Sequence, residues 1–232
     1  MLSDTFSRRR RWLWLLALAG GAGIVAAGLT QHRGGPRAAL LRLPVAYTGP
    51  ILPASAPLTA HQARVVRAAR AQVGDVYDAS YCTLAYPNGD PPRGTGACTD
   101  VVIRSLRADG IDLQALVHAD ITRHWDRYPH RWGLPRPDPN IDHRRVPNLA
   151  VFFTRHGRVL PNAITPATLP TWQPGDIVAW QLPPNTDHIG IVSDRRDAHG
   201  VPLVIHNMSR CAEQDALTAW PIVGHYRYPA KG

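Results

Sequence analysis

The chain has 232 residues, 44% of them hydrophobic, and a formal net charge of +9. This length allows one well-buried domain with an appendage and excludes two ordinary enzyme domains. The positive charge favours an anionic neighbour such as a membrane surface, a nucleic acid or a cell-wall polymer, or else reflects an arginine-rich proteome. Because no arginine run is interleaved with aromatic residues in a nucleic-acid-binding motif, we do not expect nucleic acid as a partner.

The first 30 residues have the pattern of an export signal. Four arginines at positions 8–11 precede an uncharged stretch that runs from Trp12 to Thr30, as the n-region precedes the h-region of a signal peptide. The cluster also loosely resembles a twin-arginine signal. Since the apolar run is near the length that spans a bilayer, residues 1–30 are predicted to be a cleaved signal peptide or an uncleaved anchor. We therefore expect an exported protein, periplasmic or anchored to the inner membrane facing the periplasm, with any membrane contact made through this segment.

Residues 31–57 are rich in Pro, Gly and Ala without clear periodicity and are predicted to be a linker, followed by a folded domain over residues 58–232. Thr59 can cap a first helix that ends near Gly74. Its predicted core contacts are Val65, Val66, Ala69 and Val73. Two further helices are predicted over residues 98–107 and 148–156.

After Pro174 the chain changes to short β-rich runs separated by turn residues. These runs are residues 176–180, 188–193, 203–207 and 224–228, and their spacing predicts a small antiparallel sheet. Helices followed by strands indicate an α+β domain, in which the sheet packs against the helix that begins at Cys98.

One cysteine and two histidines have the right setting for nucleophilic catalysis. Cys98 follows a Gly- and Pro-rich loop and begins a helix, whose backbone N–H groups and dipole are expected to lower the pKa of the thiol. His188 begins a strand and can act as base, and His206 on the next strand can hydrogen-bond its far nitrogen. The same three side chains as zinc ligands are a weaker hypothesis, because no CxxC or HxxxH spacing supports it. We expect no cofactor.

Four runs resemble, in order, motifs of NlpC-type peptidases: the helix start at residues 97–102 and the strands at 173–180, 188–192 and 204–207. The stretch from about Val73 to Tyr228 is also similar to the bacterial domain-of-unknown-function family 1287, most specifically at residues 86–90, 98–104, 137–149 and 224–228. The resemblance implies a papain-like NlpC-type fold with Cys98 as nucleophile, His188 as base and His206 as orienting residue. Typical NlpC-type enzymes cleave amide bonds of peptidoglycan stem peptides, which makes peptidoglycan the expected partner.

The resemblance also implies a substrate-binding set. Tyr77 stands where those enzymes have a tyrosine near the active site that helps to bind the oxyanion. His143, Arg144 and Arg145 precede the helix that flanks the cleft, and guanidinium groups suit the carboxylates of a stem peptide. The alternative for these three residues is an arginine-rich solvated turn braced by neighbouring aspartates.

Two positions depart from the NlpC-type motif at the helix start. Ala97 replaces the usual Asp before the cysteine, and Asp100 stands where the motif has Gly. Both changes touch the site that should tune the thiol. A catalytically silent cell-wall-binding module with the same fold is therefore the alternative function.

Three further residues carry open alternatives. Asn207 is the rival of His206 as orienting residue, because neighbours on a strand point to opposite faces. The resemblance favours His206. In an exported protein Cys82 and Cys211 can form a disulfide, or they can remain as two unpaired thiols.

Overall fold

The computed structural model describes residues 47–230, so the predictions for residues 1–30 and for most of the linker lie outside the described residues. The described chain is an α+β domain, as expected. Its helices are α1 (Ala60–Arg70), α2 (Cys98–Arg107), α3 (Leu113–Arg123) and α4 (Val146–His156), with short 3-10 helices η1 (Trp125–Arg127), η2 (Asp142–Arg144) and η3 (Leu169–Thr171). Within this range no helix is long and apolar enough to cross a bilayer.

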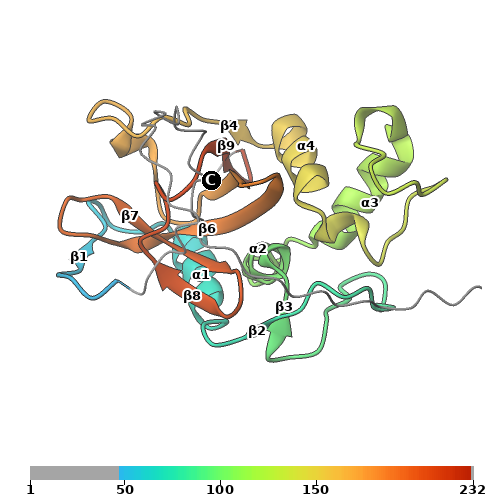
Figure 1. Cartoon of the computed structure of the whole chain (residues 1–232), viewed down its shortest axis with the longest axis horizontal. Coiled ribbons are helices and arrows are strands. Elements are labelled where there is room, and N and C mark those ends of the chain that lie inside the picture. The colour runs from blue at the N-terminus through green and yellow to red at the C-terminus, as the bar shows by residue number, and fades with distance from the viewer. Residues whose placement is uncertain (1–46, 231–232) are drawn as a thin grey trace, which may run out of the picture. The chain divides into compact units, whose positions relative to one another are not determined.

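An antiparallel sheet forms the other half of the domain, in the order β4-β9-β5-β6-β7-β8, with β1 paired to β6. The strands are β1 (Leu52–Pro53), β4 (Arg158–Val159), β5 (Ile177–Leu182), β6 (Thr186–Arg196), β7 (Pro202–Asn207), β8 (Cys211–Gln214) and β9 (Ile222–Arg227). Two short parallel strands, β2 (Val76–Tyr77) and β3 (Thr95–Gly96), lead into α2. Figure 1 shows α2 in the middle of the domain, between the sheet and the pair α3 and α4.

Apolar side chains cover both faces of this sheet, because residues on a strand alternate between faces. On one face Ile189, Ile191 and Ile205 pack with residues of α1, α2, α3 and α4. On the other face Val178, Val192 and Val204 pack with a tryptophan cluster, which consists of Trp172, Trp180 and Trp220. Strands β5, β6 and β7 are therefore hydrophobic on both sides, which explains their continuous apolar runs.

The first helix begins at the predicted cap and ends earlier than predicted. Thr59 Oγ1 accepts from the backbone N–H of Gln62 at 3.2 Å, and Gln62 Oε1 accepts from the backbone N–H of Thr59 at 2.9 Å. The helix ends at Arg70, and a turn carries the chain away to Gly74, whose N–H donates to Cys211 at 2.9 Å. Val73 consequently lies outside the helix and is 47% exposed, so its assignment to the core was wrong.

The folded unit also begins before residue 58. β1 lies in the predicted linker and pairs with β6, where Leu52 faces Arg196. The backbone N–H of Ala198 donates to Tyr47 Oη at 2.9 Å. This pairing arises because β6 extends past the end of its ladder with β5, which stops at Ile191. Helix α3 and strand β8 were not predicted, although Asp112, which caps α3 through Gln114, was a readable signal.

A buried ion cluster joins β5 to β9. The carboxylate of Asp176 accepts from Arg227 Nε at 2.7 Å and Nη2 at 2.8 Å, and it lies 2.9 Å from His225 Nε2. His225 Nδ1 lies 2.9 Å from the carbonyl of Pro161, and the ring stacks on Trp172. The imidazole is thus held between a carboxylate, a backbone carbonyl and an aromatic ring. Two of the family-like runs, at residues 173–180 and 224–228, thus have a structural role.

We expect Asp176→Asn to lower the free energy of unfolding by about 3 to 5 kcal/mol, because it removes the buried carboxylate that Arg227 and His225 contact. Urea denaturation measures this. The matched control is Asp126→Asn in the exposed pair with Arg127, which should stay within about 0.5 kcal/mol of the wild type. Equal effects of the two substitutions would contradict the structural role of the cluster.

Candidate active site

Cys98 is the first residue of α2 and is only 5% exposed. Its thiol lies against backbone N–H groups, including that of Ile189, the residue after His188. Burial raises the pKa of the Cys98 thiol to about 12, and the nearby Asp100 adds to this, although the backbone N–H groups lower it. The expectation of a low thiol pKa was therefore wrong. The free-energy cost of burying a thiolate exceeds the stabilisation that the backbone N–H groups of the helix start give it.

The two predicted histidines form a hydrogen-bonded pair. His188 Nε2 lies 2.8 Å from His206 Nδ1, and the rings of Trp180 and Trp220 lie about 5.7 and 5.8 Å from that of His188. Burial and the neighbouring His206 lower the pKa of His188 to about 3, and burial lowers the pKa of His206 to about 4. Both rings are therefore neutral near pH 7. The structure joins His206, and not Asn207, to His188.

Gly190 permits this pairing. A Cβ atom at this position would lie 2.8 Å from Val204 Cγ1 and 3.0 Å from the Cβ of His206. Such distances are below van der Waals contact, so a larger residue would push β7 away from β6 and separate the two imidazoles.

Cys98 and His188 are neighbours without being a hydrogen-bonded pair. Cys98 belongs to the core between the helices and the sheet, together with Ile189. The ring of His188 points toward the tryptophan cluster. Within residues 47–230 no hydrogen bond joins the thiol to His188, whose Nε2 is occupied by His206. Nδ1 of His188 is thus the ring nitrogen left to accept a proton.

A buried ion pair holds the helix start that carries Cys98. Arg144 donates to both carboxylate oxygens of Asp100, through Nε at 3.0 Å and Nη2 at 2.9 Å, and the two side chains are 2% and 1% exposed. Asp100 Oδ2 also accepts from the backbone N–H of Ala97 at 2.6 Å. Asp100 therefore supplies the helix cap that the alanine at position 97 lacks.

The same guanidinium fastens the loop in front of the site. Arg144 Nη1 donates to the carbonyl of Ser80 at 2.9 Å and lies 3.7 Å from Cys82 Sγ, and Nη2 donates to the carbonyl of Asp78 at 3.3 Å. Because its guanidinium group already has these partners, Arg144 has no free pair of N–H donors for a bidentate bond to a substrate carboxylate. Sequence reasoning missed the pairing with Asp100, because the two residues are 44 positions apart and no local pattern connects them.

The neighbours of Arg144 are also engaged in the fold. His143 is buried, and burial lowers its pKa to about 4. Arg145 pairs with Asp142 at 3.3 Å and lies 4.0 Å above the ring of Trp132. Asp142 braces this turn, as the alternative interpretation predicted. His143 and Arg144 are nevertheless buried, so the turn is not a solvated one.

Two more predicted residues flank the helix start. Tyr77 on β2 faces Gly96 on β3, and burial with the nearby Cys98 and Asp100 raises its pKa to about 12, so its hydroxyl stays protonated. Asn207 Nδ2 donates to the carbonyl of Gly96 at 2.9 Å. Asn207 therefore holds the loop that leads to Cys98.

Cys82, Cys98 and Cys211 are all free thiols, so the alternative of a disulfide between Cys82 and Cys211 is overturned. Cys82 faces Arg144, whereas the backbone N–H of Cys211 on β8 donates to the backbone carbonyl of Asp75. Among residues 47–230 no three His, Cys, Asp or Glu side chains are grouped to hold a metal ion. The hypothesis of a zinc site at Cys98, His188 and His206 has no support in this geometry.

Comparison with known proteins identifies the family. Residues 66–228 match the family described as "Domain of unknown function (DUF1287)". The chain belongs to this family. The DUF1287 chain is 46% identical over 203 residues to "Uncharacterized protein YijF" of Escherichia coli (strain K12), a match that covers 83% of this chain and 98% of that protein. Among solved structures, NlpC2 from Trichomonas vaginalis is similar with a TM-score of 0.40 at 15% identity, over 75% of this chain and 49% of that one.

We expect iodoacetamide to label Cys82 of the DUF1287 domain before Cys98 and Cys211 near pH 7, because only Cys82 is half-exposed. Burial raises the pKa of Cys98 and of Cys211 to about 12. The labelling rate of Cys98 should therefore rise about tenfold per pH unit between pH 7 and 9, as its thiolate fraction rises. Peptide mass spectrometry at short times measures the order. Faster labelling of Cys98 at neutral pH would contradict the effect of burial.

Substitution of either partner in the Asp100–Arg144 pair should lower the free energy of unfolding by about 3 to 5 kcal/mol, because the other charge stays buried. In a double-mutant cycle, Asp100→Asn with Arg144→Met should cost clearly less than the sum of the single changes. The exposed pair Arg131–Asp187 is the control, with a coupling below about 1 kcal/mol. Additive effects at Asp100 and Arg144 would show that the pair does not organise the helix start.

Proposed function

We propose that this domain is a cysteine hydrolase of papain-like fold that cleaves amide bonds in peptidoglycan. Cys98 is the nucleophile, His188 the base and His206 the orienting residue. The observation that carries the proposal is the 2.8 Å hydrogen bond between His188 and His206. The Cys98 thiol contacts the backbone N–H of Ile189, the residue that follows His188. A nucleophile at a helix start, a base and a group that orients the base are the parts that acyl transfer needs.

The role of His188 as base requires one of the two tautomers that this hydrogen bond allows. In that tautomer His188 Nε2–H donates to His206 Nδ1, and Nδ1 of His188 is unprotonated. In the first step Nδ1 takes the thiol proton of Cys98 while Sγ forms a bond to the carbonyl carbon and the carbonyl π electrons move to oxygen. The backbone N–H at the helix start and the hydroxyl of Tyr77 donate to this oxyanion.

The second half of the reaction returns the enzyme to its starting state. The tetrahedral intermediate expels the amine, which takes the proton from His188, and leaves a thioester on Cys98. Water then gives a proton to His188 and attacks the thioester, and the expelled thiolate of Cys98 recovers that proton. All proton transfers use His188, so no cofactor is needed.

At rest the site contains a neutral thiol and a neutral imidazole that are not hydrogen-bonded to each other. The pKa of Cys98 is raised to about 12 and that of His188 is lowered to about 3, so a thiolate forms only as the bond to substrate forms. Substrate must bring Cys98 Sγ and His188 Nδ1 within hydrogen-bond distance. Catalytic hydrogen bonds commonly tighten in this way in the enzyme–substrate complex.

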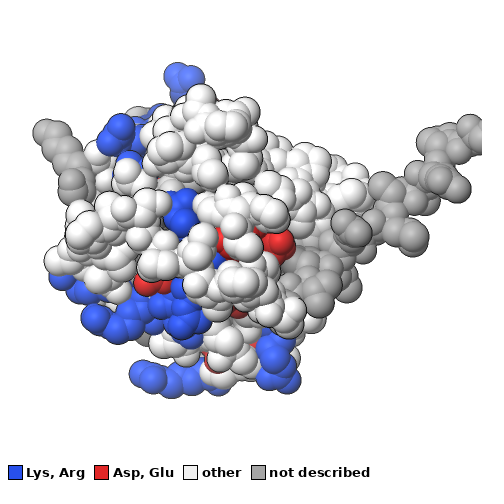
Figure 2. Space-filling model, turned by 90° about the vertical axis from the view of Figure 1, so that its left-hand side faces the viewer, with Lys and Arg blue, Asp and Glu red and all other residues white. Residues whose placement is uncertain are grey.

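The charge of the chain suits an anionic polymer as substrate. The chain has a net charge of +9, of which residues 47–230 carry only +2, because most of the excess belongs to arginines of the first 46 residues. Figure 2 shows Arg side chains gathered on the lower part of one face of the domain. Stem peptides of peptidoglycan carry carboxylates that such a surface attracts. The export signal expected at residues 1–30 would bring the domain to this polymer, in the periplasm or on the periplasmic side of the inner membrane.

A second function, that of a catalytically silent cell-wall-binding module, is favoured by one observation. The Cys98 thiol is buried, uncharged at neutral pH and close to Asp100, which opposes thiolate formation. A binding module needs the fold but not the thiolate. Its binding to peptidoglycan would be unchanged in Cys98→Ala.

The full chain incubated with muropeptides should release a new amine and a new carboxylate, detected by mass spectrometry. Cys98→Ala should abolish this release, and the control Cys211→Ala, at a thiol outside the site, should retain it. Among the histidines, His188→Ala should reduce turnover most, by about 100-fold or more, His206→Ala less and His206→Asn least, because Asn can still accept from His188. Binding of peptidoglycan without product from the wild type would establish the silent module instead.

A further inference from the structure

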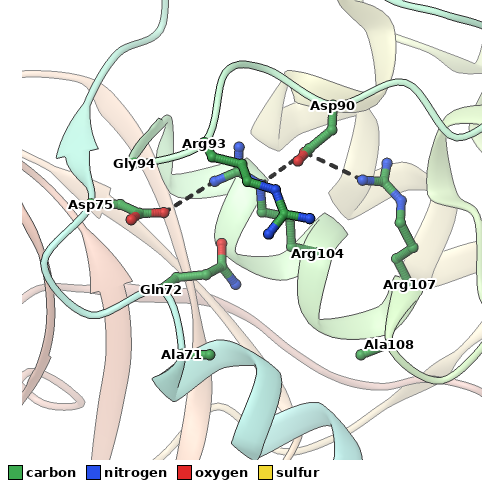
Figure 3. Close-up of a pocket in the computed structure, with 9 residues that line it drawn as sticks. All are labelled: Ala71, Gln72, Asp75, Asp90, Arg93, Gly94, Arg104, Arg107 and Ala108. Carbon is green, nitrogen blue, oxygen red and sulfur yellow. Dashed lines mark hydrogen bonds and ion pairs between the residues drawn. The ribbon is translucent and has the colours of Figure 1, made fainter.

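A cavity of about 550 Å³ lies at the C-terminal half of α2, and Cys98 does not line it. Its polar lining consists of Gln72, Asp75, Asp90, Arg93, Arg104 and Arg107. Figure 3 shows Arg93 extending toward the middle of this pocket, with Gln72 below it and Arg107 on the far side of Asp90. The volume is that of a small-molecule site.

Arg104 uses four of its five N–H donors within the protein. Its Nε donates to Asp90 at 2.8 Å, and its Nη1 lies 3.2 Å from Asp75. Nη1 also donates to the carbonyl of Thr95 at 2.9 Å, and Nη2 donates to the carbonyl of Pro91 at 3.2 Å. Arg104 and the two carboxylates therefore form the wall of the pocket.

The other two arginines keep unused donors. Arg107 lies 3.3 Å from the same oxygen of Asp90 and donates to Gly89, but its Nε is buried without a partner. Arg93 is exposed and has no hydrogen bond or ion pair with any residue in 47–230. Three guanidinium groups against two carboxylates leave one positive charge in the pocket.

An unused acceptor lies in the same wall. Gln72 is 7% exposed, and its Nε2 donates to the carbonyls of Ala68 and Val101, each at 3.2 Å. These two bonds fix the amide, and its Oε1 is buried without a partner. A buried acceptor of this kind is stabilised by a ligand that donates to it.

We propose that this pocket binds a small ligand that carries one carboxylate and an N–H group. The carboxylate bridges Arg93 and Arg107, and the N–H donates to Gln72 Oε1. Guanidinium groups match a carboxylate in charge and geometry. A monoanion fits the single surplus charge, whereas a phosphate dianion would be repelled by Asp75 and Asp90. This site goes beyond the proposed function and does not depend on the chemistry of Cys98.

Isothermal titration calorimetry of the full chain with N-acetylglycine tests the proposal, with N-acetylglycinamide as the probe that lacks the charge. We expect N-acetylglycine to bind, and N-acetylglycinamide and inorganic phosphate to bind at least about tenfold more weakly. Arg93→Ala should weaken N-acetylglycine about tenfold and Arg93→Glu should abolish its binding. Arg123→Ala, at an exposed arginine on α3, is the matched control and should change nothing.

Equal binding of the acid and the amide would overturn the proposal, as would unchanged affinity in Arg93→Ala or no binding of N-acetylglycine. Loss of binding in Cys98→Ala would also overturn it, because the ligand would then occupy the other site. Retained binding in Cys98→Ala supports it. A protein that binds N-acetylglycine through Arg93 but releases no product from muropeptides supports this pocket while the proposed function fails.

Discussion

The start of α2 depends on one buried charge pair. Asp100 closes the helix end that Ala97 cannot cap, and Arg144 neutralises Asp100 while it fastens the loop at residues 78–82. Such a pair contributes little net stability compared with apolar packing, but loss of one partner leaves an unpaired buried charge. The Asp100–Arg144 pair therefore specifies how the surrounding segments are arranged. The loop, the helix start and η2 must come together for either charge to be tolerated.

This arrangement has a consequence for the chemistry of the thiol. The polar partners at the helix start are committed to Asp100 and to the backbone, so Cys98 is enclosed by protein and its thiol stays protonated. The tryptophans around His188 have a parallel effect and keep the imidazole neutral. A buried neutral thiol avoids the stray reactions of a free thiolate. In the proposed mechanism the charges would separate only in the reaction step itself.

The two ends of α2 have different environments. The N-terminal end meets the sheet at Ile189 and carries Cys98. The C-terminal end carries Arg104 and Arg107, whose positive charges complement the negative end of the helix dipole. The same two side chains line the cavity of about 550 Å³. The short strands β2 and β3 lie between these regions, because Asp75 belongs to the cavity and Tyr77 to the site of Cys98. The two ends of one helix thus lie in chemically distinct environments.

The sequence by itself determined α2, the main strands and the pairing of His206 with His188. Apolar periodicity and turn residues located α2 and the main strands, and the two-residue period of a strand allowed only one of His206 and Asn207 to point toward His188. Tertiary structure decided the pKa of Cys98, the engagement of Arg144 by Asp100, the free thiols and the pairing of β1 with β6. Helix and strand patterns are local properties of a few neighbouring residues. Burial and ion pairing depend on which distant segments meet, and no window of sequence contains that information.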